Sequence, residues 1–223
     1  MKSDVYTLYV YYTWHEFTDF EKGMVVSMGI EKRFRKELQN KPFTSYDEYM
    51  DYVFACVNVR LADYIEGLMR KYASGQGNFK NVMYPDIEIA HDLCNNKILQ
   101  FVQREDIDDE ADESMDEVID DELKDILAAF SEEEVTQEVE EVLDVEGMLN
   151  FIDARLQVTD LTEVNLPFYE LCHKLDFSHF SVFTMASAIL SSTQTSYASV
   201  FQIVNENGSL TAPTVESAGK LYF

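Results

Sequence analysis

The chain has 223 residues, of which 46% are apolar, including 15 Phe and 13 Tyr, and its formal net charge is −25. This apolar content supplies a buried core and argues against disorder of the whole chain, because high net charge prevents folding mainly where apolar residues are scarce. A pI near 4.3 argues against direct binding to nucleic acid or to an anionic membrane, and it favours a basic protein surface as the partner.

The cysteines and the N-terminus both indicate an intracellular protein. Cys56, Cys94 and Cys172 show no Cys-x-x-Cys spacing, which predicts buried thiols in a reducing compartment and argues against a disulfide framework. Asp4 interrupts the N-terminal apolar segment, and no small-residue cleavage site follows it, so we expect no signal peptide. No run approaches the roughly 20 apolar residues of a membrane-spanning helix. We therefore expect a cytoplasmic protein without membrane contact.

The negative charge is concentrated in residues 105–146. These 42 residues hold 21 acidic side chains and one basic side chain, Lys124, and so carry −20 of the net charge of −25. The sequences on either side are close to neutral by comparison. We predict three regions: a near-neutral N-terminal α+β region (1–104), an acidic link followed by two amphipathic helices (105–146), and a helical region with a C-terminal hairpin and tail (147–223).

The first region is predicted to contain one strand and three helices. β-branched and aromatic residues on both faces indicate a strand over 5–13, and a looser helical spacing runs over 18–40. Ser45 is placed to cap the clearest helix of the chain, 46–73, and a proline in the first turn opens another helix over 85–101. The only basic cluster that the sequence shows is interpreted as a solvated helix end; it comprises Lys32, Arg33, Arg35, Lys36 and Lys41.

The acidic region is predicted to begin as a solvated link and to continue as two helices. Apolar residues recur at spacings of three and four over 115–130 and again over 135–143, and Gly147 is placed to end the second helix. Because like charges at helical neighbour spacing are destabilising, these helices need tertiary docking or a basic partner. The predicted partner-binding carboxylates are Asp116, Glu117, Asp120, Asp121, Asp125, Glu132, Glu133, Glu134, Glu138, Glu140 and Glu141.

The third region is predicted to contain two helices and a hairpin. Helices are expected over 165–175 and 178–190, and the second of them is too apolar, without Arg or Lys, to read DNA. Asn207-Gly208 between the apolar runs 197–204 and 209–215 predicts a β-hairpin. The predicted fold class is therefore α+β and predominantly helical, with amphipathic helices, an N-terminal strand and a C-terminal β-hairpin. The tail ends in apolar anchors expected to dock on a neighbouring chain or on this one: Leu221, Tyr222 and Phe223.

Two Glu-x-x-His pairs are the best candidates for a metal site: Glu88 with His91, and Glu170 with His173. A carboxylate and an imidazole three residues apart on a helix can bind one ion, and two such pairs are half the ligand set of a di-iron helical bundle. However, His91 lies on an apolar stripe, and the helix bearing His173 is short. A calcium-loop spacing over 106–117 lacks the central glycine that the turn needs. We therefore predict no metal, no cofactor and no catalytic residue.

Three functional hypotheses follow. The first is a non-enzymatic acidic interaction protein that docks its carboxylate-rich helical face on a basic surface of a larger, nucleic-acid-handling machine. The second is a structural or assembly subunit of a large particle, of which a virus is one example, located in the cytoplasm, in an infected host cell or in the virion. The third is a di-metal carboxylate enzyme built on a helical bundle. The first is preferred because the charge is segregated into 42 residues that keep an apolar helical stripe.

Overall fold

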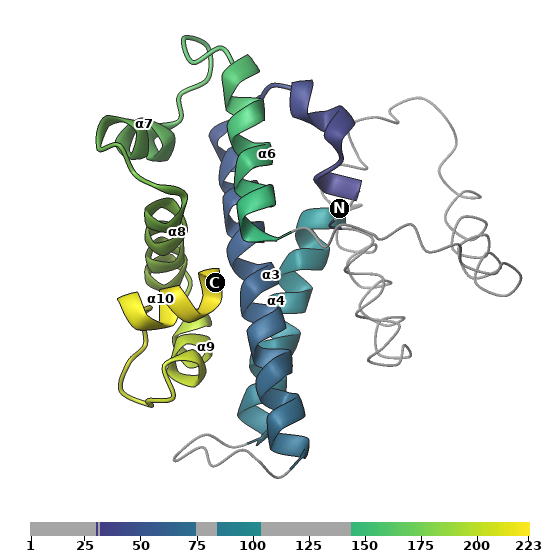
Figure 1. Cartoon of the computed structure of the whole chain (residues 1–223), viewed down its shortest axis with the longest axis vertical. Helices are drawn as coiled ribbons and strands as arrows, with labels where there is room; N and C mark the ends of the chain where they lie inside the picture. Colours follow the sequence, from purple (N-terminus) through teal and green to yellow (C-terminus); the bar gives the residue numbers. More distant parts are fainter. Residues whose placement is uncertain (1–29, 31, 75–83, 104–143) are drawn as a thin grey trace, which may run out of the picture.

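A computed structural model describes residues 30, 32–74, 84–103 and 144–223, and every regular element within these ranges is helical (Figure 1). The fold class α+β is therefore wrong for the described residues, and the strand predicted over 5–13 lies outside them. The elements are η1 (Lys36–Asn40), α3 (Tyr46–Ala73), α4 (Tyr84–Gln103), α6 (Val145–Val158), α7 (Pro167–Lys174), α8 (His179–Thr193), α9 (Tyr197–Val204) and α10 (Val215–Tyr222).

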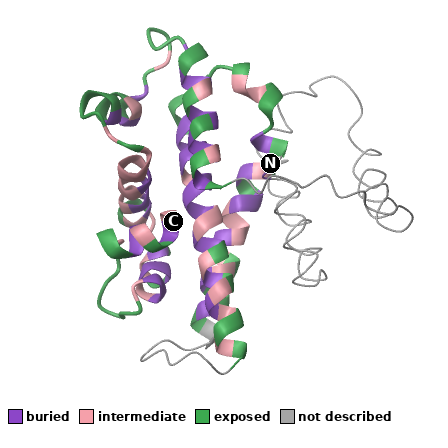
Figure 2. Cartoon of the chain, in the orientation of Figure 1, coloured by how far each residue is buried: buried purple, intermediate pink, exposed green. Residues whose placement is uncertain are grey.

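Helix α3 is the element around which the other helices pack. It begins after Ser45, whose hydroxyl accepts a hydrogen bond from the backbone N–H of Glu48 at 3.1 Å, which confirms the predicted cap. Six of the seven residues over 52–58 are buried, so the middle of this helix is covered on all sides. Helix α4 runs along it, and α6, α8 and α10 also contact it (Figure 1). Buried residues of all these helices form one hydrophobic core (Figure 2).

The predicted C-terminal β-hairpin is wrong. Its first strand is α9, and its second is an irregular segment that leads into α10. Tyr197, Val200, Phe201 and Val204 are each fully buried, and their spacing of three, one and three residues places them on one face of a helix. An apolar run of eight residues is compatible with a buried helix as well as with a buried strand. Here the packing against α4 and α8 favours the helix.

The Asn207-Gly208 signal marks the end of α9 instead of a hairpin turn. Glu206 has a left-handed backbone with φ 52°. Its N–H donates to the carbonyl of Ile203 at 2.9 Å, and the N–H of Asn207 donates to the carbonyl of Gln202 at 3.0 Å. These two bonds form the Schellman motif that commonly ends helices. Helix α7 ends in the same way, with Asp176 at φ 51°.

Helix α6 begins inside the acidic region that the sequence defines. The helix end predicted at Gly147 is wrong, because Gly147 lies in the first turn of α6 and its N–H donates to the Asp144 side chain at 2.6 Å. Residues 148–158, which show no clear pattern in the sequence, are helical. Asp144 and Glu146 thus stabilise a helix N-terminus, where negative charge is favourable.

Several local predictions are confirmed. Helix α4 follows the predicted start at Pro85, and α7 begins at Pro167. The Ser178 hydroxyl caps α8 by accepting from the N–H of Ser181 at 3.3 Å. All three cysteines are free and buried, as predicted. Within the described ranges, no helix combines the length and apolar character needed to cross a membrane.

The basic cluster near the N-terminus is only partly solvated. Arg33 is 7% exposed, and its guanidinium lies 4.7 Å from the ring centroid of Phe101 and 5.5 Å from that of Tyr52. The interpretation of this cluster as a solvated helix end is therefore wrong for Arg33, because ring faces stabilise a buried cation there. Of the helix predicted over 18–40, residues 18–29 and 31 lie outside the described ones, and the described part ends after Arg33 and gives way to η1.

Five rings, which we call the aromatic cluster, join the segment before α3 to α3, α4 and α6. Tyr52 lies at the centre, and the centroids of the other four rings are 4.9 to 5.8 Å from its own. Several pairs meet edge to face, which is a favourable arrangement of aromatic quadrupoles. The aromatic cluster consists of Phe34, Phe43, Tyr52, Phe101 and Phe151.

Arg155 of α6 is fully buried against the aromatic cluster. Its guanidinium carbon lies 4.0 Å from the ring centroid of Phe43. Its Nε donates to the carbonyl of Lys41 at 2.8 Å, and its Nη2 donates to the carbonyl of Pro42 at 3.1 Å and to the carboxylate of Glu48. One side chain therefore holds the segment before α3, the first turn of α3 and the last turn of α6 together.

Glu48 and Thr159 complete this buried network. Glu48 accepts from the N–H and the hydroxyl of Thr44, each at 2.8 Å, while the hydroxyl of Thr159 accepts from the N–H of Phe43 at 2.9 Å. Burial favours a raised pKa for Glu48, but hydrogen bonds from Thr44 and the charge of Arg155 outweigh burial, so the pKa of this carboxyl is lowered. The carboxylate is thus charged at neutral pH.

Arg155→Leu is expected to lower the free energy of unfolding by about 3 kcal/mol, the lower end for a broken buried pair, because two carbonyls and the Glu48 carboxylate, whose side chain is 16% exposed, lose their donor. Chemical denaturation measures this loss. The control is Arg70→Leu, which breaks the exposed pair with Glu66 at 2.6 Å and should have a far smaller effect. Equal losses in the two variants would contradict a special role for Arg155.

Glu206→Gly is expected to raise the free energy of unfolding by about 1 kcal/mol, because glycine adopts the left-handed backbone without a Cβ penalty. Thermal and chemical unfolding measure the gain. Ser199→Gly, at an exposed position inside α9, is the control and should lower stability, since glycine is a poor former of helix interiors. A loss of stability in both variants would show that φ at Glu206 carries no cost.

Candidate functional site

The carboxylates predicted to form the partner-binding face, Asp116 to Glu141, lie outside the described residues. We call the described residues the scaffold. The described chain ends with α4 before the acidic region and resumes at Asp144, the N-cap of α6. Phe101 near the first point and Phe151 near the second both belong to the aromatic cluster. Described residues on either side of the acidic region therefore belong to the same group of buried rings.

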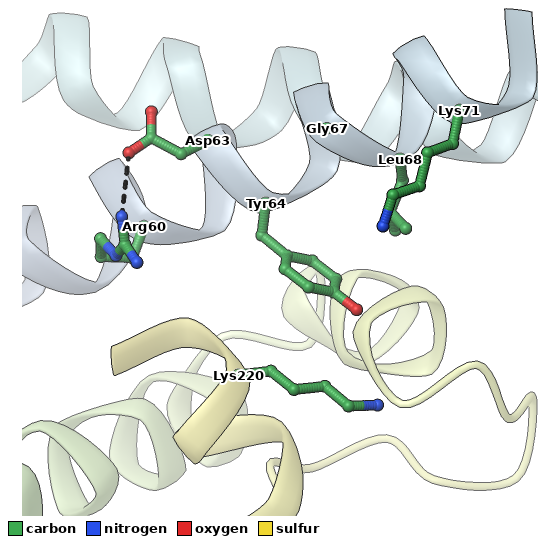
Figure 3. A pocket seen from close by; sticks show the side chains of 7 residues that line it. All are labelled: Arg60, Asp63, Tyr64, Gly67, Leu68, Lys71 and Lys220. Atoms are coloured by element: carbon green, nitrogen blue, oxygen red, sulfur yellow. Dashed lines mark ion pairs between the residues drawn. The ribbon is translucent and has the colours of Figure 1, made fainter. Parts of the chain in front are cut away.

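A cavity of about 260 Å³ lies between α3 and α10, and we call it the cationic pocket (Figure 3). Three basic side chains and one carboxylate line it, although the whole chain has a net charge of −25. An ideal Cβ added at Gly67 meets no atom within 4 Å, so the α3 wall is open at this point. The lining residues are Arg60, Asp63, Tyr64, Gly67, Leu68, Lys71 and Lys220.

Helix periodicity and long-range packing together build the cationic pocket. Arg60, Tyr64, Gly67 and Lys71 are spaced four, three and four residues apart, which places them on one face of α3. Helix α10 then brings Lys220 to that face. The stripe on α3 is visible in the sequence, but the approach of Lys220 is not, because it depends on how α10 docks. Sequence analysis therefore misses this site.

Two of the three cations already have partners. The Nε of Arg60 donates to the carbonyl of Leu221 at 2.7 Å, and its Nη1 lies 3.6 Å from the carboxylate of Asp63. The ammonium of Lys220 lies 3.2 Å from the carboxylate of Glu216, which is 80% exposed. The guanidinium thus fixes the C-terminal end of α10 to α3, whereas the lysine pair is a surface interaction.

Tyr64 contributes a neutral donor to the cationic pocket. Burial raises the pKa of its phenol, and the positive charge of Lys220 only partly opposes this shift. The hydroxyl therefore keeps its proton at neutral pH. Figure 3 shows the ammonium groups of Lys71 and Lys220 on the same side of the Tyr64 ring as this hydroxyl.

The C-terminal tail docks on this chain's own helices. Thr214 caps α10, Leu221 is 1% exposed, and the ring of Tyr222 meets that of Phe180 edge to face at 5.4 Å. Phe223 stacks on Phe180 at 5.9 Å but is 91% exposed. Of the three predicted anchors, two are thus packed against their own chain and one is left accessible to a partner.

His179 and the carboxylates that it faces join three helices close to the described end of the acidic region. At the start of α8, its Nδ1 lies 2.7 Å from the carboxylate of Glu146, and its Nε2 lies 2.8 Å from that of Asp153, both on α6. The hydroxyl of Tyr222 on α10 donates to the same Glu146 carboxylate. Both ring nitrogens face carboxylates, and both can donate only when the imidazole is protonated. We call this set the histidine bridge.

The electrostatics of the histidine bridge favour the charged imidazole. Burial by itself lowers the pKa of His179, but the hydrogen bonds and negative charges of Asp153 and Glu146 outweigh burial, so the pKa is raised. In return, hydrogen bonds from Tyr222 and His179 lower the pKa of Glu146.

The two Glu-x-x-His pairs lie in different parts of the fold. Glu88 and His91 are near the start of α4, beside the C-terminal end of α3, whereas Glu170 and His173 are on α7, beside the opposite end of α3 (Figure 1). Both glutamates are exposed, and His173 stacks on the ring of Tyr169 at 5.6 Å. Across the described part of the chain, no three His, Cys, Asp or Glu side chains gather into a group that could hold a metal ion. The structure does not bring these pairs together.

Comparison with known proteins gives no significant match to this chain among protein-family models, curated proteins or solved structures. A function is therefore proposed from the charge, burial and contacts of the chain's own residues.

The histidine bridge is expected to make stability depend on pH. The pKa of His179 is raised in the folded state above its ordinary value of 6.5, so the stabilisation is fully present below that value and is lost as the pH rises through the folded-state pKa. Urea unfolding at a series of pH values measures this loss, which should be smaller in His179→Gln. His173→Gln, which removes an exposed imidazole outside the bridge, should keep the wild-type profile. A His179→Gln profile identical to that of the wild type would sink the interpretation.

Proposed function

We propose that this protein is a non-enzymatic acidic interaction protein whose region 105–146 binds a basic surface of a larger, nucleic-acid-handling machine. The observation that carries the proposal is charge segregation: 42 residues hold −20 of the net charge of −25. Spacings of three and four between apolar residues over 115–130 support a helical face opposite the carboxylates. Such a face resembles a nucleic acid in its density of negative charge.

The scaffold supports this proposal by anchoring both ends of the acidic region. Phe101 before the region and Phe151 after it pack against the central ring of the aromatic cluster at 4.9 and 5.8 Å. Arg155, paired with Glu48 and packed on Tyr52, locks α6, which carries Phe151, to α3. A charged region anchored at both ends on a buried core loses less conformational freedom on binding than a free tail, because both attachment points are already fixed.

The concentrated charge sets the expected character of binding. A concentration of negative charge accelerates the encounter with a positively charged surface. Dissolved salt screens this attraction, with a screening length of roughly 8 Å at physiological ionic strength. Affinity should therefore fall steeply as salt rises, and a polyanion such as DNA should compete for the same basic surface. The proposed partner is therefore defined by its chemistry alone, as a basic surface that also binds polyanions.

Neutralising the acidic region tests the proposal directly. The variant replaces Glu132, Glu133, Glu134, Glu138, Glu140 and Glu141 with glutamine, in the full chain. We expect a partner purified with the wild-type protein to dissociate in about 1 M salt, to be displaced by added DNA, and to be lost from the variant, because screening and neutralisation remove the same attraction. Binding is measured by titrating the purified partner against each protein.

The matched control neutralises the same number of carboxylates on the scaffold. It replaces six exposed scaffold residues with their amides, namely Glu37, Glu88, Asp92, Glu163, Glu170 and Asp176. This control should retain the partner, because it changes the net charge equally and leaves the acidic region intact. A partner that both variants lose equally, or that the wild type retains unchanged in about 1 M salt, would contradict the proposal.

A further inference from the structure

We propose that the cationic pocket binds a small organic phosphate, namely a phosphomonoester whose apolar part lies against α3. The proposal concerns the groove between α3 and α10 and is independent of the acidic region. It rests on a cavity of about 260 Å³ whose lining brings two lysines and a phenol hydroxyl to one side of the Tyr64 ring (Figure 3).

The donors of the cationic pocket suit a phosphate group. Lys71 and Lys220 supply two ammonium groups, and the protonated hydroxyl of Tyr64 supplies a neutral donor. A phosphate dianion presents three acceptor oxygens and is commonly bound by lysine acting as a point charge. These donors come from two helices on opposite walls, so an anion between them would be contacted from both sides.

The position of Arg60 argues against a carboxylate as the preferred ligand group. Bidentate recognition of a carboxylate needs a free guanidinium fork. The guanidinium of Arg60 is already committed, with Nε on the Leu221 carbonyl at 2.7 Å and Nη1 at 3.6 Å from Asp63. Arg60 therefore holds the two walls of the site together, with its charge balanced by Asp63, while the lysines and Tyr64 remain to contact the ligand.

The α3 wall provides space for an apolar group beside the phosphate. Leu68 and the ring of Tyr64 form an apolar surface, and the absence of a side chain at Gly67 leaves the space above the helix open. The cavity volume, about 260 Å³, is near the lower limit of ordinary small-molecule sites. A single aromatic ring bearing one phosphate matches this size.

One carboxylate near the cationic pocket competes with an anionic ligand for Lys220. Glu216 pairs with Lys220 at 3.2 Å, but this carboxylate is 80% exposed, and exposed pairs contribute little. A dianion that reaches Lys220 replaces this contact. Removing the competing carboxylate should therefore strengthen ligand binding, whereas damage to the fold would weaken it.

The test measures binding of phenyl phosphate to the full chain by calorimetry, with inorganic phosphate and phenol as comparison probes. Phenyl phosphate should bind saturably and more tightly than either probe. Lys71→Gln should weaken it about tenfold, because a charge-assisted contact is lost. Lys174→Gln, an exposed lysine on α7, should leave it unchanged. Gly67→Phe should abolish binding by filling the cavity, whereas Gly67→Ala should retain it.

Glu216→Gln is the decisive variant, and it should strengthen phenyl phosphate binding by about twofold or more. Thermal unfolding of each variant shows whether it folds. If Gly67→Phe does not fold, the lysine and glutamate variants decide whether the pocket binds the ligand. Absence of saturable binding, equal weakening by Lys71→Gln and Lys174→Gln, or unchanged affinity in Glu216→Gln overturns the proposal. Equal affinity for phenyl phosphate and inorganic phosphate overturns the claim of an organic ligand.

Discussion

The buried ion pair between Arg155 and Glu48 is the interaction on which the described structure depends. Moving two charges out of water costs several kcal/mol per ion, roughly, so such a pair persists only where further hydrogen bonds compensate the loss of hydration. Here two backbone carbonyls and two ring faces share the guanidinium, and the Thr44 N–H and hydroxyl share the carboxylate. These directional contacts allow one arrangement of the segment before α3, of α3 and of α6.

That arrangement also determines the position of Asp144 and Glu146, the described end of the acidic region. Because α6 is locked by Arg155, Asp144 and Glu146 at its N-terminus have defined positions relative to α8 and α10. Through the histidine bridge, Glu146 contacts both α8 and the C-terminal helix α10. The cationic pocket lies on the other flank of α10, where Arg60 holds the same helix to α3. Both candidate sites are therefore products of how α6 and α10 dock on α3.

The sequence predicts those parts of the fold that local chemistry determines. Ser45, Pro167 and Ser178 mark helix starts correctly, because a capping hydroxyl or a proline acts within one turn. The hairpin prediction fails because α9 ends in a Schellman motif whose left-handed residue is Glu206, just before Asn207-Gly208, and because the preceding apolar run suits a buried helix.

Long-range contacts lie beyond prediction from one sequence. Nothing in the sequence around Arg155 distinguishes it from a surface arginine, since its carboxylate partner is 107 residues away. The sequence shows the α3 residues of the cationic pocket as a stripe on one helix face. It does not show Lys220, which reaches the pocket only through the packing of α10. The same limit applies to the two Glu-x-x-His pairs, whose spacing suits a shared metal although the fold separates them.

The separation between Glu48 and Arg155 also has a kinetic consequence. Helices α3 and α4 are adjacent in sequence and pack along each other, so their contacts close early at small entropic cost, whereas Arg155 must cross 107 residues to reach its partner. Contacts that form after the rate-limiting step of folding act on the rate of unfolding. We infer that the Arg155–Glu48 contact forms late in folding, so that it slows unfolding more than it speeds folding.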